Sequence, residues 1–441
     1  MVTIKSKILF LVACLIETVG LLLAQISGSQ FLIIPCLVCF LALALWGAVK
    51  GFAVPVMLFF LPFSMLLKIR PGTISFFTFA LVLIYVVYIA MGSRGISIKH
   101  VIPALLLIGL ALTVITVKGY PLANNFILFI ASLLMVPFMM RELDDKYDFY
   151  WLTLFFSVGI IVAAVSAKFL IVYPNINRYI MTHSLYSTLR WTGYYEDPNF
   201  YSAQITAALA GVLIVLLNSN KRRQSIIWTV LLAVLMYCGL LSLSKSFFLI
   251  SVALLLVWIS ILMFKSGKLS TRIIVLIMIT VAAVIFLSMT VFGDLITLML
   301  ARFAGNSTWS DFTTKRTDLW AMYIREFLEN PRLYILGTWT GFEHIDGHAT
   351  HNTILQSIFQ FGIVGSIILI VWEVFFIKTL MAGNKIPRGH FMQAVLLLIG
   401  SFGPWVALDF LFFDEFFLLP IYVCAGLRYM AKNDVNELTL Q

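Results

Sequence analysis

Apolar stretches of about 20 residues recur along the whole chain, separated by short polar segments. A helix of that length crosses the hydrocarbon core of a bilayer, where every backbone polar group must be paired inside its own segment. The pattern therefore restricts the chain to a bundle of transmembrane helices. Its composition, 61% hydrophobic and 11% charged, is far from that of a soluble domain. This excludes a soluble enzyme, a disordered chain and, despite the net charge of +10, a nucleic-acid-binding protein.

The apolar stretches predict an all-α polytopic membrane protein with about 14 (12–14) transmembrane helices. The candidate spans cover residues 8–25, 31–49, 52–67, 73–91, 101–117, 122–140, 150–172, 199–217, 225–243, 246–264, 273–292, 352–377, 390–408 and 411–427. The span at 52–67 is short and contains Pro55 and Pro62, so we expect it to kink or to merge with a neighbour. The first span follows Lys5 and Lys7 but is longer than a signal-peptide core, and we expect a retained helix.

Lys and Arg residues concentrate in every second loop, which by the positive-inside rule makes these loops and both termini cytoplasmic. This topology divides the chain into three parts. Residues 1–292 hold the first eleven helices and a short outer segment at 173–198, residues 293–351 form a large outer loop, and residues 352–441 hold the last three helices and a short tail. The five cysteines lie in apolar segments and are expected to be small buried hydrophobes: Cys14, Cys36, Cys39, Cys238 and Cys424.

The large outer loop contains one predicted amphipathic helix, at 317–329. Its apolar stripe has 3.6-residue spacing and consists of Leu319, Trp320, Tyr323, Ile324, Phe327 and Leu328. Asn330 and Pro331 are expected to end it. Such a helix suits the membrane surface or the cover of a cavity. Lys315 and Arg316 stand at its start, where unpaired backbone N–H groups attract anions. A solvated basic face is the alternative interpretation.

A polar and aromatic group ends the outer segment before residue 199 and leads directly into a span. It consists of Arg190, Trp191, Tyr194, Tyr195, Asp197 and Asn199. Aromatic faces stack on sugars and a guanidinium binds phosphate, so the group is a candidate substrate site. The alternative is a helix cap at Asp197 or Asn199 with aromatic residues at the membrane interface. A second polar turn, Ser242 to Ser246, joins two later spans and contains Lys245.

Three of the six histidines fall close together at the end of the large loop. The segment reads Glu343-His344-Ile-Asp346-Gly-His348-Ala-Thr-His351-Asn352, and the histidine spacing is compatible with a helix. His351 opens the next span. Histidine titrates near neutral pH and so suits a general base. A metal site is the rival functional interpretation, disfavoured by Gly347 within the segment, and a hydrophilic loop with chance histidines is the third.

Taken in order, these features resemble the O-antigen polymerase and O-antigen ligase family over about residues 185–370. The resemblance is carried by Arg190-x-x-Gly193 before Asp197-Pro198-Asn199, Ser242-Leu-Ser-Lys245, Arg316 before a Trp-bearing helix, His351-Asn352-x-x-Leu355-Gln356, and Phe361-Gly362-Ile363-Val364-Gly365. It implies a GT-C-like glycosyltransferase of the bacterial cytoplasmic membrane. Its members act on the outer face, need no metal or other cofactor, and use sugar chains linked to undecaprenyl pyrophosphate.

The resemblance also implies roles for individual residues. Arg190 and Arg316 would hold the pyrophosphate, and His351 would take the proton from the acceptor sugar, with Glu343 or Asp346 orienting or replacing it. Further substrate contacts would come from the aromatic residues above, with Trp320 and Trp339, and from Asp197, Asn199, Lys245, Lys315, Arg325, Glu343 and Asn352. Lys245 stands where many members have arginine, which loses the bidentate phosphate geometry. Arg325 and Arg332 cannot be aligned.

Three functions remain open. The leading prediction is a polymerase of lipid-linked repeat units for O-antigen, capsule or exopolysaccharide, with the lipid bilayer, a flippase and a chain-length regulator as its surroundings. A ligase would pass the chain to a lipid A core or another acceptor, and residue types do not separate the two. A transporter of lipid-linked sugars is the alternative of another class. It is disfavoured because few ionisable residues, Glu17 and Glu373 among them, lie within spans.

Overall fold

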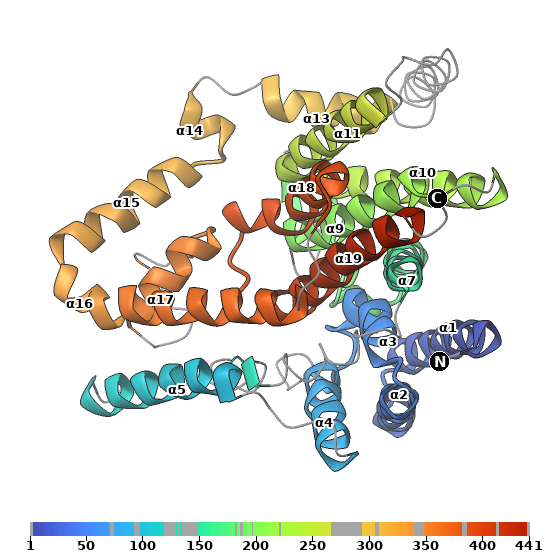
Figure 1. Cartoon of the computed structure of the whole chain (residues 1–441), viewed down its shortest axis with the longest axis horizontal. Helices are drawn as coiled ribbons and strands as arrows, with labels where there is room; N and C mark the ends of the chain where they lie inside the picture. Colours follow the sequence, from blue (N-terminus) through green and yellow to red (C-terminus); the bar gives the residue numbers. More distant parts are fainter. Residues whose placement is uncertain are drawn as a thin grey trace.

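The fold is almost entirely helical (Figure 1). The computed structural model describes residues 3–70, 75–91, 98–118, 129, 133–134, 148–180, 183–185, 188–195, 197–219, 222–265, 293–304, 308–338, 345, 348–381, 386–411 and 414–438. A short hairpin interrupts the helices: β1 (His183–Leu185) pairs antiparallel with β2 (Thr188–Arg190), with His183 opposite Arg190. A one-turn helix, α8 (Pro174–Asn177), precedes it.

Eight helices in the described part are long and apolar enough to cross a membrane. Seven are α1 (Ile4–Ser27), α2 (Gln30–Lys50), α7 (Phe149–Leu170), α9 (Pro198–Leu217), α10 (Arg222–Leu241), α11 (Lys245–Lys265) and α17 (Thr353–Met381). The eighth is α18 (Phe391–Phe402), extended by the 3-10 helices η2 (Arg388–His390) and η3 (Gly403–Val406). Shorter apolar helices are α3 (Ala53–Phe60), η1 (Leu61–Phe63), α4 (Phe76–Ala90) and α5 (Ile98–Lys118), and α19 (Glu415–Leu438) is the last. The chain is therefore an all-α, multi-pass membrane protein.

The predicted spans fall on these helices, with two kinds of exception. Those at 122–140 and 273–292 lie outside the described residues, apart from positions 129, 133 and 134. The segment at 52–67, predicted to be short and kinked, is a short helix: α3 ends at Phe60 and gives way to a single 3-10 turn that contains Pro62. Every residue of α3 is buried. At 1.5 Å per residue it is about 12 Å long, too short to cross a bilayer.

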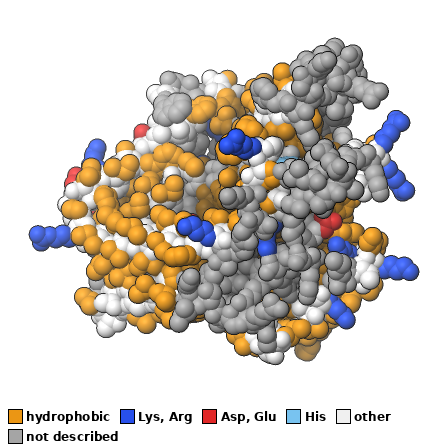
Figure 2. Space-filling model, viewed as in Figure 1, with side chains coloured by type: hydrophobic (Ala, Val, Ile, Leu, Met, Phe, Trp, Pro, Cys, Tyr) orange, Lys and Arg blue, Asp and Glu red, His pale blue; other side chains and the backbone are white. Residues whose placement is uncertain are grey.

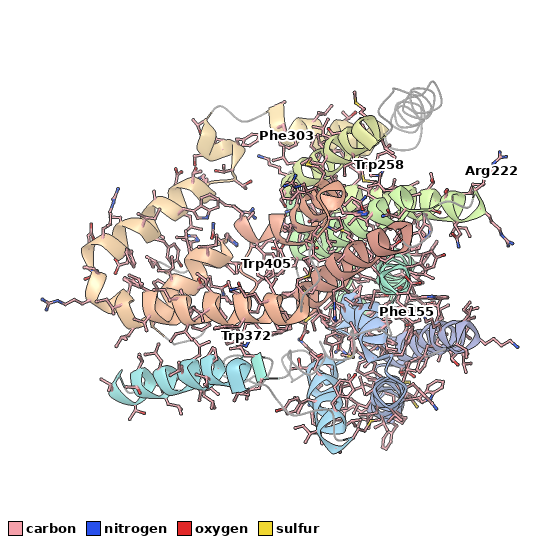
Figure 3. All side chains as sticks on the ribbon, viewed as in Figure 1. Phe155, Arg222, Trp258, Phe303, Trp372 and Trp405 are labelled. Carbon is pink, nitrogen blue, oxygen red and sulfur yellow. The ribbon has the colours of Figure 1, made fainter. Side chains whose placement is uncertain are left out.

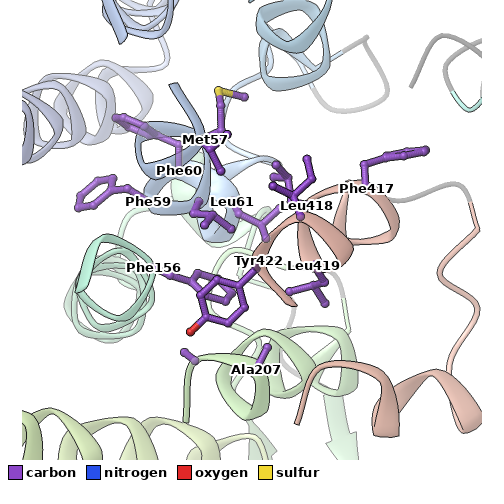
Figure 4. Close-up of a cluster of buried hydrophobic side chains, with 14 of the residues drawn as sticks. Met57, Phe59, Phe60, Leu61, Phe156, Ala207, Phe417, Leu418, Leu419 and Tyr422 are labelled. Carbon is purple, nitrogen blue, oxygen red and sulfur yellow. The ribbon is translucent and has the colours of Figure 1, made fainter. Parts of the chain in front are cut away.

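The centre of the bundle is α9, which packs against α7, α10, α11, α18 and α19. Small residues on α9 allow this close approach. Gly211 leaves room for the Tyr422 hydroxyl, which hydrogen-bonds with Thr153 Oγ1 at 3.0 Å. Figure 4 shows Tyr422 beside Phe156 and Ala207, together with residues of α3 and of the start of α19. This core fixes α7, α9 and α19 relative to one another.

Helical segments fill most of the described part of the predicted loop at 293–351. The predicted helix at 317–329 is confirmed as α15 (Arg316–Glu329), and Asn330 follows it as expected. The structure adds α13 (Gly293–Ala304), α14 (Trp309–Phe312) and α16 (Pro331–Leu336), which were not predicted. Figure 1 shows α15, α16 and α17 together at one end of the molecule.

A glycine contact locks α16 to α17. Gly337 follows α16 with a φ of 75°, and Gly362 breaks the helical path of α17 with a φ of 69°. Each glycine lies against the backbone of the other, so closely that a Cβ on either would collide with it. Thr338 N–H also donates to the Phe359 carbonyl at 3.1 Å. A glycine is therefore required at both positions, because both the left-handed φ and the close approach exclude a side chain.

Candidate functional site

Arg190 is buried in a cluster of polar groups between α9 and the α10–α11 turn, and its side chain is 7% exposed. Its Nε donates to the Ser242 carbonyl at 3.1 Å and its Nη2 donates to Asn199 Oδ1 at 3.2 Å. The Ser244 hydroxyl donates to the same Asn199 oxygen at 2.8 Å. Two motifs that are separate in the sequence thus form one unit, which we name the Arg190 cluster (Arg190, Asn199, Ser242 and Ser244).

Asp197 caps α9, as the alternative interpretation expected. Its carboxylate accepts from the Asn199 N–H at 2.5 Å, and Pro198 occupies the first turn, where no N–H is needed. The side-chain oxygen of Asn199 accepts hydrogen bonds from Arg190 and Ser244. Trp191 is half-buried against the core, and its backbone N–H donates to the Leu241 carbonyl at 3.1 Å.

The two tyrosines predicted to line a sugar path lie in the core instead. Tyr194 is fully buried against Phe63, and its hydroxyl donates to Ser166 at 2.9 Å. The Tyr195 hydroxyl donates to Glu415 at 2.8 Å, and Glu415 also accepts from Gln204 at 2.6 Å. Burial raises the pKa of the Tyr195 phenol, and the Glu415 carboxylate raises it further, so Tyr195 remains a donor. The error arose because a sequence does not distinguish core tyrosines from interfacial ones.

His351 stands directly before α17, with its side chain 45% exposed. Asp409, which is buried, lies behind it: Oδ2 accepts from the His351 N–H at 2.9 Å and is 3.9 Å from Nδ1 of the imidazole. The other oxygen of Asp409 accepts from the Asn352 N–H at 3.0 Å and from the Thr350 hydroxyl. These bonds hold His351 at a φ of 46°, which is unusual for a residue other than glycine.

Asp409 was not predicted, because it lies 58 positions after His351 in the sequence, whereas the predicted partners Glu343 and Asp346 lie close to it. Its place between the predicted spans at 390–408 and 411–427, with the apolar neighbours Leu408 and Phe410, is the signal that would have found it. Glu343, Asp346, His344 and Trp339 lie outside the described residues. The helical spacing of the histidines does not produce a helix at His348, because Ile345 and His348 form an isolated β-bridge.

Asn352 is an N-cap of α17 and not a surface residue. Its Oδ1 accepts from the N–H groups of Ile354 and Leu355, at 2.9 and 3.0 Å, and its Nδ2 donates to the Val406 carbonyl at 3.1 Å. The side chain is buried, so the predicted substrate contact is corrected to a structural one. Trp405, labelled in Figure 3, lies in η3 beside Val406, whose carbonyl accepts the Asn352 hydrogen bond.

Helix α15 presents one face to residues 348–352, which we name the His351 segment. Trp320 Nε1 donates to the Thr350 carbonyl at 3.1 Å, and the Tyr323 hydroxyl donates to the His348 carbonyl. Burial raises the pKa of the Tyr323 phenol, which keeps it a donor. Arg316 precedes Trp320 by one turn and therefore lies on the same face of α15. The structure thus brings Arg316 to the side of α15 that faces His351.

The remaining predicted cations are placed differently. Lys245 Nζ donates to the carbonyls of Asp311 and Phe312, at 3.2 and 3.1 Å, and lies over the Phe303 ring. It therefore ties α11 to α14 by contacts with the protein. Lys315 is exposed at the start of α15 with a φ of 61°. Arg325 is exposed about half a helical circumference away from Arg316, so it is separated from the His351 face.

A continuous series of contacts connects the three residues predicted to be catalytic. From Arg190 it passes to Asn199 and so to Phe200, the next residue in the chain. The Phe200 ring centroid is 4.9 Å from that of Phe410, the residue that follows Asp409. From Asp409 it passes to His351 and Thr350, then to Trp320 and along one helical turn to Arg316. Arg190, on the α9 side, and Arg316, on α15, are therefore each linked to His351 through intervening residues.

Comparison of the chain with protein-family models, with curated proteins and with solved structures finds no match. Within the described ranges, no three His, Cys, Asp or Glu side chains come together as metal ligands would. The described cysteines form no disulfide. Cys39 is exposed and Cys36 is half-buried, contrary to the expectation that all five are buried. The site is therefore characterised by its own geometry.

Proposed function

We propose that this protein is a membrane glycosyltransferase that polymerises oligosaccharide units linked to undecaprenyl pyrophosphate. The observation that carries the proposal is the exposed imidazole of His351 with the buried carboxylate of Asp409 3.9 Å behind it. An imidazole backed by a carboxylate is suited to accept a proton, because the carboxylate stabilises the imidazolium that results. The family resemblance supplies the substrate class, and the outer face of the bacterial cytoplasmic membrane is part of the proposal.

In the proposed reaction, His351 takes the proton from an acceptor sugar hydroxyl. The hydroxyl oxygen bonds to the anomeric carbon of the donor, and the bond from that carbon to the pyrophosphate oxygen breaks. Undecaprenyl pyrophosphate leaves with the bonding electrons, and the proton passes from His351 to solvent or to the leaving phosphate. No nucleotide sugar is required, because the donor arrives already activated.

Arg316 is the cation proposed to meet the pyrophosphate. It lies on the α15 face that contacts the His351 segment, one turn from the half-buried Trp320, whose ring is proposed to stack on a sugar. A guanidinium binds phosphate oxygens with two parallel bonds and stabilises charge that develops on the leaving group.

Arg190 has a different proposed role. Its guanidinium already donates to Asn199 and Ser242 and is almost fully buried, so it holds the start of α9 and supplies a fixed positive charge from behind the site. A buried charge acts through a lower effective dielectric than a solvated one. This separates Arg316, which would contact the substrate, from Arg190, which would position the site.

Reconstitution tests the proposal. Purified protein in liposomes receives undecaprenyl-pyrophosphate oligosaccharide with EDTA present, and products are separated by size and mass. We expect a ladder of repeat multiples from the wild type and its loss in His351→Ala, Asp409→Asn and Arg316→Ala. His348→Ala is the matched control, because His348 is exposed in the same segment and contacts Tyr323 through its backbone carbonyl.

Each other outcome has a defined meaning. Transfer that requires an added lipid A core would make the protein a ligase, with the same site residues. Movement of the lipid between leaflets without any covalent product would identify a transporter and overturn the proposal. A ladder that persists in His351→Ala would exclude the proposed base.

A further inference from the structure

The proposed function uses only one face of helix α15. At 100° per residue, Arg316, Trp320 and Tyr323 share the face toward the His351 segment. The charged residues Asp318, Arg325 and Glu329 lie on a second face. Between them is a third, formed by Thr317, Ala321, Ile324 and Leu328, and it lacks any charge. We name this third face the apolar flank.

The apolar flank is exposed in the structure. Leu328 is 70% exposed and Ile324 is 49% exposed. The exposed apolar surface continues onto α16 through Ile335 and Leu336, and Ile354 is exposed at the start of α17. Figure 2 shows hydrophobic side chains over much of the surface on the side of the view where α15, α16 and α17 lie. Apolar side chains grouped in this way mark a contact with another apolar phase.

A cavity of about 150 Å³ lies under the apolar flank, between α15, α16 and α17. Its lining is apolar and aromatic: Tyr323, Ile324, Phe327, Tyr334, Leu355, Ile358 and Phe359. Ile324 belongs both to this lining and to the exposed flank, so the cavity adjoins the flank. The walls from α17 belong to a helix long and apolar enough to cross the membrane. An apolar cavity beside a membrane span is suited to hydrocarbon.

The bend at Gly362 indicates how deeply α16 and the start of α17 lie in the membrane. Residues 363–381 form a helix of about 28 Å, which alone matches the ~30 Å hydrocarbon core. Residues 353–361 are then not needed to cross, and Gly362 is placed near the boundary of the core. Gly337, at the end of α16, is in direct contact with Gly362. The end of α16, with its exposed Ile335 and Leu336, is therefore placed at the same boundary.

From this geometry we propose that α15 and α16 form an interfacial element embedded in one leaflet of the bilayer, with the apolar flank among the acyl chains of membrane phospholipids. The charged face of α15, with Arg325 and Glu329, points to the headgroups and water, as in other helices that lie in an interface. Acyl chains occupy the apolar cavity. This inference concerns the position of α15 and holds independently of the reaction that the site catalyses.

A fluorescent label attached to the flank tests the proposal in the full-length chain. Cys36 and Cys39 are first replaced by Ala, because they are half-buried and exposed, whereas Cys14, Cys238 and Cys424 are buried and remain. An NBD label is then attached at Leu328→Cys or at Glu329→Cys, two adjacent exposed positions on different faces of α15. The protein is placed in phosphatidylcholine–phosphatidylglycerol vesicles, with or without acyl chains brominated near the carbonyl.

We expect the label at position 328 to emit at shorter wavelength and to lose fluorescence in the brominated vesicles. The label at position 329 is expected to be quenched by aqueous iodide and little affected by bromine. Iodide quenching of both labels, with no bromine effect at 328, would show that α15 projects into water and would overturn the proposal. Equal bromine quenching of both labels would also overturn it, because α15 would then be immersed on all sides. Ile324→Cys gives a second reading of the flank if Leu328→Cys does not fold.

Discussion

The Arg190 cluster and the His351 segment are both polar regions in an apolar protein, but they differ in how their polar atoms are used. In the Arg190 cluster, the guanidinium, amide and hydroxyl groups bond to one another, and Arg190 is 7% exposed. In the His351 segment, the bonds hold the backbone, and the imidazole remains 45% exposed. Buried groups with satisfied hydrogen bonds specify a structure, whereas an exposed base with a carboxylate behind it can react. The difference supports the proposal that the first region positions the site and the second carries out the chemistry.

The largest expected effect is on turnover in the His351 segment. We expect His351→Ala to lower the rate by about 10²–10⁴-fold, the usual contribution of a general base, while the thermal unfolding temperature changes little because the imidazole is half-exposed. The measurement is the initial rate of ladder formation in liposomes. His348→Ala should retain activity. If both variants kept the wild-type rate, the assignment of chemistry to this segment would be wrong.

The next largest effect is expected on stability, at the contact between Gly337 and Gly362 of α17, the helix that follows His351. Gly362→Ala is expected to destabilise the fold by about 3–5 kcal/mol, because it combines overpacking with a left-handed φ. Thermal unfolding in detergent measures this loss. Gly109→Ala is the control, since a Cβ at Gly109 of α5 meets no atom within 4 Å. Equal stability of the two variants would contradict the proposed lock between α16 and α17.

In the Arg190 cluster, stability should fall together with activity. Arg190→Ala leaves Asn199 Oδ1 and the Ser242 carbonyl without this donor, and a loss of about 2–4 kcal/mol is expected for two buried groups. Its unfolding temperature is compared with that of Arg178→Ala, an exposed arginine of the same connecting segment. A fully stable but inactive Arg190→Ala would instead place Arg190 in the chemistry and break the distinction between the two regions.

The smallest expected effect is a difference in stability between variants of the two core tyrosines. Tyr195→Phe removes a bond to the buried carboxyl group of Glu415 and should cost about 1–3 kcal/mol. Tyr194→Phe removes a bond to the Ser166 hydroxyl and should cost about 0.5–1.5 kcal/mol. Turnover measured well below the unfolding temperature should be close to wild type in both. A specific rise in KM for the sugar substrate in either variant would restore the predicted sugar contact.

Local patterns were sufficient for most of the long helices of this protein. Length and apolarity predicted α1, α2, α7, α9, α10 and α11, and the 3.6-residue stripe with Asn330-Pro331 predicted α15, because both signals act within one segment. The Asp197 cap of α9 was likewise visible, since a cap bonds only to its own first turn. The complete burial of α3 was not predicted, because it depends on neighbours distant in the chain.

The sequence by itself determined the class of molecule and most of its helices, since the cost of unpaired backbone in hydrocarbon leaves a long apolar segment almost no other conformation. It also indicated His351, Arg316 and Arg190 as candidates. Only the tertiary structure decided that Asp409, and not a nearby acid, stands behind His351, that Arg190 is bonded to Asn199 and Ser242, and that Tyr194 and Tyr195 are core residues. Apart from the bond between Arg190 and Asn199, these relations join residues tens to hundreds of positions apart. They depend on how helices pack, which residue spacing along one chain does not encode.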